Sequence, residues 1–260
     1  YVETIAHPFV ANVTAQGIDK GVDVLEGQPY ESPLAPFGGI EQFDWSPDSK
    51  TIAYTSRKKE GVDYAVSTDA DIYLFNIETK TDRNLCKPEG YVEPKIDYTK
   101  SLRNQKVNHQ EGDLNVGYDV NPRFSPNGKY VAWLSMERDG YESDRNRLCI
   151  YELATGKKFY VTENFDSNVD DYCWNNDSKT LYFIGCWHAT VNAYQTNLKG
   201  EVKKLTEGKH NYVALQLLGN TGKLLGTRQS MTVPSDLYVI SPAKKEGQSE
   251  QQQITFENKN

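Results

Sequence analysis

The chain has 260 residues, of which 37% are hydrophobic and 12% aromatic, and this is enough apolar material for one large buried core. Its formal net charge is −7, with acidic and basic residues interspersed, which argues against a nucleic-acid-binding surface. No apolar run approaches the length needed to cross a bilayer, so we expect no membrane span.

The N-terminal stretch YVETIAHPF reads as a strand, and the Pro/Gly-rich connector PYESPLAPFGG follows it. A hairpin pattern then appears four times: WSPDSKTIAYTS from residue 45, RFSPNGKYVAWLS from 123, WNNDSKTLYFIG from 174 and the weaker LGNTGKLLGTRQ from 218. The aligned lysines are separated by 79, 50 and 44 residues. Propeller blades repeat about every 40–50 residues, so the first interval is a blade plus an insertion.

Each copy predicts the same succession of strands. An aromatic residue ends a short first strand, and a turn rich in Pro, Asp, Asn and Gly leads to a β-branched and aromatic second strand. A third alternating run, such as DIYLFNIETK or RLCIYELATGKK, is followed by a short fourth one. Four antiparallel strands repeated at this period indicate an all-β fold, a β-propeller.

We expect four blades, at about 40–86, 118–163, 168–207 and 211–257, within one propeller domain spanning 1–260. Residues 87–117 form a polar insertion centred on RNQKVNHQEGD, and YVETIAHPF is interpreted as the last strand of an earlier blade. The aromatic residues at equivalent positions are predicted to pack between blades: Trp45, Phe124, Trp174, Tyr54, Trp133 and Phe183.

The sequence contains few patterns that indicate a metal or cofactor site. None of the four cysteines belongs to a Cys-x-x-Cys pair, so a zinc site is not expected. Asp44, Asp119 and Asp171 lie near the start of first strands, but no calcium-binding loop with a distal Glu accompanies them. We therefore expect neither a metal nor a cofactor.

The strings GGIEQFDWSPDSKTIAYTSRK, PRFSPNGKYVAWLSMERDGYESDRNRL, FIGCWHA and TRQSM carry a family likeness. They resemble the N-terminal propeller domain of prolyl oligopeptidase-family serine peptidases, especially bacterial dipeptidyl-peptidase and acylaminoacyl-peptidase members. The resemblance implies a propeller of seven or eight blades, a C-terminal α/β-hydrolase domain as partner, a peptide substrate, and a periplasmic or secreted location. The final ITFENKN resembles the junction at which that hydrolase domain begins.

The chain contains no G-x-S-x-G nucleophile elbow, and its histidines have no partner serine in such a setting. We therefore expect no catalytic residue and no peptide hydrolysis by this chain alone. The resemblance implies that it forms part of a larger propeller in a serine-type dipeptidyl- or acylaminoacyl-peptidase.

Residues that follow the second strand of each copy leave equivalent strands in the same direction, so we expect them on one face with Arg57. The candidate substrate-binding residues are Glu137, Arg138, Glu142, Trp187, His188 and Arg228. The resemblance implies that an acidic propeller side chain holds the free amino end of a peptide, with Glu137 the first candidate and Glu142 the second. Arg138 or Arg228 would instead grip a carbonyl or carboxylate through its guanidinium fork.

Each assignment has a structural alternative. The charged residues can be ordinary solvated charges of the rim, because an exposed ion pair contributes only about 0–1 kcal/mol. Trp187 can cover the neighbouring blade, with His188 beside it.

For the whole chain, two functions of different class remain open: a substrate-gating propeller of a serine exopeptidase, and a stand-alone TolB-like propeller that binds proteins. An α/β-hydrolase sequence downstream of Asn260 would favour the first.

Overall fold

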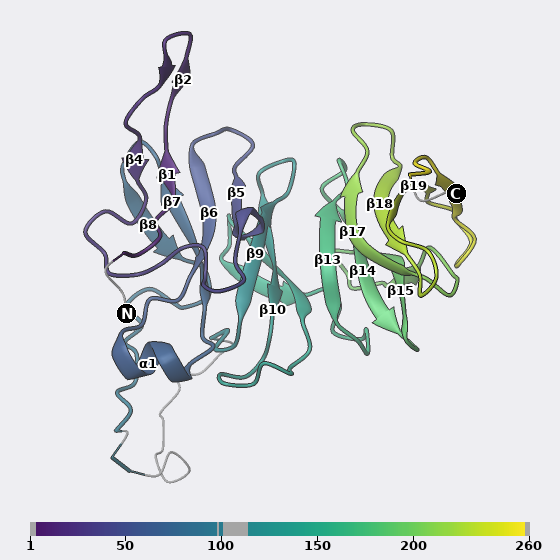
Figure 1. The fold of residues 1–260 in the computed structure, drawn as a ribbon. Helices are drawn as coiled ribbons and strands as arrows, with labels where there is room; N and C mark the ends of the chain where they lie inside the picture. The colour runs from purple at the N-terminus through teal and green to yellow at the C-terminus, as the bar shows by residue number, and fades with distance from the viewer. Residues whose placement is uncertain (1–3, 98, 101–113, 258–260) are drawn as a thin grey trace.

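The computed structural model describes residues 4–97, 99–100 and 114–257, and the whole of RNQKVNHQEGD (103–113) lies outside them. Its main elements are four antiparallel sheets, hydrogen-bonded in chain order (Figure 1). The first is β5 (Phe43–Trp45), β6 (Thr51–Ser56), β7 (Asp71–Asn76) and β8 (Thr81–Asn84). The second is β9 (Asp119–Phe124), β10 (Tyr130–Ser135), β11 (Arg147–Glu152) and β12 (Lys157–Tyr160).

The third sheet is β13 (Val169–Trp174), β14 (Thr180–Trp187), β15 (Thr190–Asn197) and β16 (Lys203–Lys204). The fourth is β17 (Asn211–Leu217), β18 (Leu224–Gln229), β19 (Asp236–Ser241) and β20 (Glu250–Gln253). One parallel bridge, Val191 with Asn211, joins the third sheet to the fourth. These four-stranded sheets are propeller blades, which we call blades 1 to 4.

Two small two-stranded sheets precede blade 1. β1 (Phe9–Val10) pairs with β4 (Val22–Asp23), and β2 (Val13–Thr14) pairs with β3 (Gly17–Ile18) in a hairpin that projects at the top of Figure 1. The stretch YVETIAHPF was expected to supply the last strand of another blade. In residues 4–9 that expectation is wrong, because only Phe9 is in a strand and its partner is Asp23.

The first hairpin of each blade explains why the sequence repeats. In blade 1 the Asp48 carboxylate accepts hydrogen bonds from the Ser46 hydroxyl (2.6 Å) and the Lys50 amide (3.1 Å). Asn127 does the same in blade 2 for Ser125 and Lys129. The next residue takes a left-handed conformation in blades 1 to 3, with φ of 59°, 67° and 54° at positions 49, 128 and 178. Gly128 adopts it without strain, and the side chain before it closes the turn.

The hydrophobic core lies between blades rather than inside any one of them. One buried cluster joins blade 1 to blade 2, a second joins blade 2 to blade 3, and a third joins blade 3 to blade 4. A fourth cluster packs Val24 and Leu25, from the segment after β4, against blade 1.

Five of the six aromatic residues predicted to pack between blades are buried, and Trp133, Tyr54 and Phe183 are fully so. The prediction for Trp45 is wrong, because this side chain is 48% exposed. Its counterpart Trp174 packs on the preceding blade, stacking on Tyr130 at 6.2 Å between ring centroids. Blade 1 packs instead against the Val24–Leu25 segment, which does not extend over Trp45.

The aspartates considered above for calcium have structural partners. Asp44 accepts the Phe124 amide of blade 2 (2.6 Å), and Asp171 accepts the Leu215 amide of blade 4 (3.0 Å). Asp119 is fully buried, accepts hydrogen bonds from the Trp133 indole and from Asn115, and has a pKa raised well above its usual value by burial. Among the described residues no group of His, Cys, Asp and Glu has the arrangement of a metal site.

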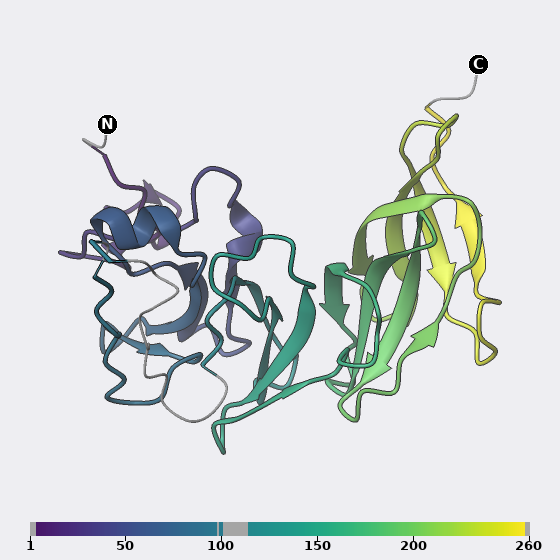
Figure 2. The ribbon, with the colours of Figure 1, turned by 90° about the horizontal axis from the view of Figure 1, so that it is seen from below.

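The second and third strands of each blade are connected at one end of the molecule, which we call the BC end. Its loops are residues 57–70, 136–146, 188–189 and 230–235. The first contains α1 (Gly61–Val66), a helix of six residues, at the lower left of Figure 1. Figure 2 looks onto the BC end, with α1 at the left and the yellow strands of blade 4 at the right. In the described residues no helix is long and apolar enough to cross a membrane.

Trp133 and Trp45 form a matched pair for testing the core. Trp133→Ala is expected to lower the free energy of unfolding by about 3–5 kcal/mol, the range for a fully buried aromatic side chain. Trp45→Ala, at an exposed position of the preceding blade, is expected to cost less than about 1 kcal/mol. Urea titrations of the two variants and the unmodified chain measure both. Equal losses would show that the packing described for blade 2 is incorrect.

Candidate functional site

The loop at 136–146 carries three of the predicted site residues: Glu137, Arg138 and Glu142. The first two have different environments. The Glu137 side chain is 72% exposed and its carboxylate lies 4.0 Å from Arg147. Arg138 forms an ion pair with Asp144: its Nε lies 3.0 Å from both carboxylate oxygens, and its backbone amide also donates to Asp144 (2.9 Å). This hydrogen bonding lowers the pKa of Asp144. The guanidinium of Arg138 is therefore neutralised by a carboxylate of its own loop.

The other three predicted residues lie on blades 3 and 4. Trp187 is 44% exposed at the end of β14, and its ring stacks on that of His188 at 4.6 Å. His188 and Ala189 form the tight turn, with φ of 49° and 59°. Arg228 lies over the Tyr238 ring at 3.5 Å and donates to Gln251 (3.1 Å). The guanidinium of Arg228 is thus also occupied within its blade.

A cavity of about 560 Å³ lies at the BC end where blades 1 and 2 meet. Its walls are largely small, apolar and hydroxyl side chains, and its charged lining residues in the described part of the chain are Arg57 and Glu142. The lining residues are Ala35, Pro36, Arg57, Ala65, Val66, Ser67, Thr68, Tyr118, Gly140, Tyr141, Glu142 and Ser143. Of the six predicted residues, Glu142 is the one found in this lining; Arg138 lines a neighbouring cavity of about 330 Å³.

Arg57 is the notable cation of this cavity. It is 9% exposed, donates through Nη1 to the Ser67 carbonyl (2.8 Å), and lies over the Tyr64 ring at 4.1 Å. Its Nε is buried without a hydrogen-bond partner, and no carboxylate of residues 4–97, 99–100 or 114–257 pairs with it. A buried guanidinium without a counter-ion is costly, and an acceptor that enters the cavity lined by Arg57 would offset part of that cost.

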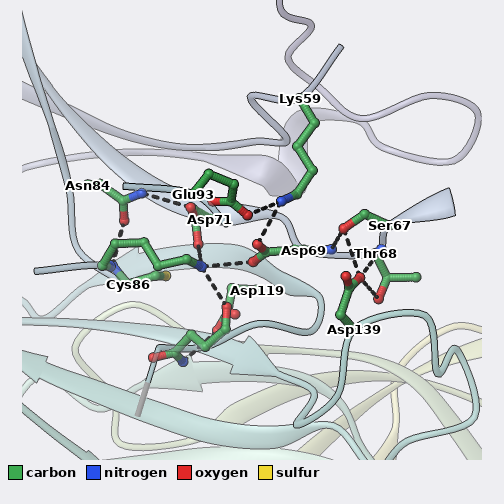
Figure 3. Close-up of polar contacts among 12 residues, drawn as sticks. Lys59, Ser67, Thr68, Asp69, Asp71, Asn84, Cys86, Glu93, Asp119 and Asp139 are labelled. Atoms are coloured by element: carbon green, nitrogen blue, oxygen red, sulfur yellow. Dashed lines mark hydrogen bonds and ion pairs between the residues drawn. The ribbon is translucent and has the colours of Figure 1, made fainter. Parts of the chain in front are cut away.

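Another cavity, of about 800 Å³, lies nearby between blade 1 and the first residues of the insertion, but its buried charges are paired. Lys87 contacts Asp69 (2.8 Å) and Asp71 (2.7 Å), and Lys59 contacts Asp69 (3.1 Å) and Glu93 (Figure 3). Burial by itself lowers the pKa of Lys87, but Asp71 and Asp69 outweigh burial and raise it. These charged side chains neutralise one another, and we infer that their ion pairs attach the insertion to blade 1.

The sequence pattern places Arg57 at the BC end, where it is found, and names Arg138 or Arg228 as the residue that grips a carbonyl or carboxylate. Arg57 directly follows β6 and Arg138 lies in the loop after β10, whereas Arg228 lies inside β18. Their tertiary partners also differ. One signal was available: Asp144 follows Arg138 by six residues in the same loop and is positioned to neutralise it. No comparable local signal identifies Arg57 as unpaired.

Comparison with known proteins confirms the resemblance predicted from the sequence: the chain resembles the N-terminal propeller domain of prolyl oligopeptidase-family serine peptidases. In particular, it is 43% identical over all 260 residues to dipeptidyl-peptidase 5 of Porphyromonas gingivalis, and the match covers 33% of that protein. The chain thus spans about one third of the length of the curated relatives it matches. No protein-family model matches it.

Solved structures support the propeller fold. Puromycin hydrolase superposes with a TM-score of 0.63 at 9% identity, covering 96% of this chain and 35% of the hydrolase. TolB from Acinetobacter baumannii gives a TM-score of 0.55 at 16% identity, covering 95% of this chain and 48% of TolB. At these identities the likeness indicates the fold alone.

His210, at the BC end of blade 4, gives the chain an acid sensitivity that can be measured. Burial, together with Arg228 and Lys204, lowers the pKa of His210 from 6.5 to about 4. In the unfolded chain this imidazole takes up its proton near pH 6.5, so acid favours unfolding between about pH 6.5 and 4. We expect His210→Asn to lose less stability than the unmodified chain between pH 7 and 4.5. Parallel urea midpoints at the two pH values test this, and identical losses would contradict it.

Proposed function

We propose that the chain is a non-catalytic propeller region of a dipeptidyl peptidase and that its BC-end cavity holds the amino end of a peptide. The observation that carries this proposal is the buried Arg57 guanidinium, which has no carboxylate partner among the described residues and shares a cavity with Glu142. The 43% identity to dipeptidyl-peptidase 5 along the whole chain supports a peptide as the ligand.

The two charges suit the two ends of a short peptide segment. Arg57 donates a charge-assisted hydrogen bond to a backbone carbonyl of the peptide. Glu142 accepts from the terminal ammonium through a charge-assisted hydrogen bond. The volume of about 560 Å³ is within the range of small-ligand pockets, and Ala65 and Val66 in the lining can contact an apolar side chain of the peptide. Glu137, which is mostly exposed and faces Arg147, becomes the second candidate for the ammonium.

In this proposal the BC end faces an α/β-hydrolase domain that supplies the catalytic serine, and the propeller gates access to the space between them. A length of about three times this chain in dipeptidyl-peptidase 5 supports the presence of further domains. A secreted or periplasmic location belongs to the same proposal. The alternative, a protein-binding TolB-like module, is supported by the fold likeness alone.

Binding of two small probes to the purified chain tests the proposal. Alanyl-alanine amide has a free ammonium, and its N-acetyl derivative does not. Arg57→Met is expected to weaken binding of both probes by roughly 10- to 100-fold, the effect of losing a hydrogen bond to a charged group. Glu142→Gln is expected to weaken the free-amine probe alone. NMR titration gives each dissociation constant.

Glu137→Gln is the matched control, because it removes a carboxylate from the same loop outside the cavity lining. It is expected to leave both affinities unchanged. If the unmodified chain binds neither probe, or if Arg57→Met binds both as well as the unmodified chain, the proposed site is wrong. An effect of Glu137→Gln equal to that of Glu142→Gln would move the ammonium-binding role to Glu137.

A further inference from the structure

One carboxylate connects the two loops that form the cavity. Asp139, in the blade 2 loop, accepts hydrogen bonds at Oδ1 from the Thr68 amide (2.6 Å) and the Ser67 hydroxyl (2.8 Å) of the blade 1 loop (Figure 3). In return, the Thr68 hydroxyl accepts from the Gly140 amide (2.8 Å). Ser67 and Thr68 are 7% and 6% exposed, so this contact is anchored in a buried part of blade 1.

The same short segment also positions Arg57. The Ser67 carbonyl receives Nη1 of Arg57 at 2.8 Å, and Ser67 Oγ donates to Asp139. The orientation of the Arg57 guanidinium and the attachment of the blade 2 loop therefore depend on the same residue. A shift of Ser67 would move both.

The blade 2 loop is internally braced on the other side of Asp139. Arg138 and Asp144 close it with an ion pair, and the Asp144 amide donates to the Tyr141 carbonyl (3.1 Å). Glu142 lies between these braced residues. The loop thus behaves as one unit, and the contacts of Asp139 and Gly140 with Thr68 and Ser67 determine where that unit, with Glu142, sits relative to Arg57.

We propose that Asp139 is a positioning residue for the peptide site: by fastening the blade 2 loop to Ser67 and Thr68, it holds Glu142 at the working distance from Arg57. The inference rests on the proposed function, since it concerns the same cavity. Asp139 itself is absent from the cavity lining in the described residues, so it acts through the loop and not by touching the ligand.

The test compares Asp139→Ala with Asp139→Asn. All three Asp139 contacts with Ser67 and Thr68 involve Oδ1, and an asparagine carbonyl oxygen can accept them at the same place. Asp139→Ala removes all three contacts and is therefore expected to weaken binding of alanyl-alanine amide about five- to tenfold, on the scale of one net hydrogen bond. It is also expected to abolish the preference over the N-acetyl probe. Asp139→Asn is expected to keep both properties.

Asp48→Ala is the matched control. Asp48 also accepts a serine hydroxyl and a backbone amide within a loop, but it lies in the first hairpin of blade 1, at the opposite end from the BC loops. It is expected to change thermal stability without changing either affinity. A purely structural role for Asp139 would make the two alanine variants alike: lower stability, with the preference for the free amine intact.

The outcomes separate this inference from the proposed function. If Arg57→Met weakens binding and Asp139→Ala does not, the positioning role is refuted and the peptide site stands. If Arg57→Met has no effect, the site itself fails. Should Asp139→Ala not fold, Asp139→Gln serves in its place, because its longer side chain moves the accepting oxygen away from the Thr68 amide and the Ser67 hydroxyl. Unchanged discrimination by Asp139→Gln would then refute the inference.

Discussion

The structure depends on the fact that a four-stranded blade has two apolar faces and can bury them only by stacking on neighbours. In β10, Val131 and Trp133 belong to the core shared with blade 1, whereas Ala132 and Leu134 belong to the core shared with blade 3. Alternate residues of one strand thus serve two interfaces. This is why β10 and β14 are almost continuously apolar, and why stability is a property of adjacent pairs of blades.

Apolar stacking alone leaves two blades free to slide over one another, and polar groups between blades remove that freedom. Asp44 and Asp171 each accept a backbone amide from the next blade, and the Tyr172 hydroxyl donates to the carbonyls of Asn121 (2.7 Å) and Ala132 (2.8 Å) in blade 2. Burial raises the pKa of both aspartates, a cost that directional hydrogen bonds partly offset. Asp139 acts in the same way between loops, because its carboxylate in blade 2 accepts hydrogen bonds from Ser67 and Thr68 in blade 1.

The repeat could be predicted from the sequence because its determinants are local. The turn residues at Asp48 and Asn127 bond within their own hairpins, and strand alternation needs no knowledge of partners. Trp45 was misjudged because its burial depends on what precedes blade 1, which the repeat does not specify. For the same physical reason, the sequence does not show that the Arg57 guanidinium lacks a carboxylate partner among the described residues. Whether a guanidinium is paired is decided by residues distant in the sequence, and these are not read from spacing.

The two ends of the blades differ in sequence: the first hairpins repeat at one end, and the BC loops vary at the other. The residues of the proposed site lie at the variable end. The first hairpins repeat the same turn because each must connect adjacent strands at a fixed spacing. The BC loops do not repeat one turn type and differ in every blade. They range from the two-residue turn at His188–Ala189 to the helix-containing loop at 57–70. Since stacking fixes the ends of β6 and β10 side by side, Arg57 and the loop of Glu142 are brought together before any ligand arrives. The propeller therefore preorganises these loop residues, as the proposed binding of a peptide end requires.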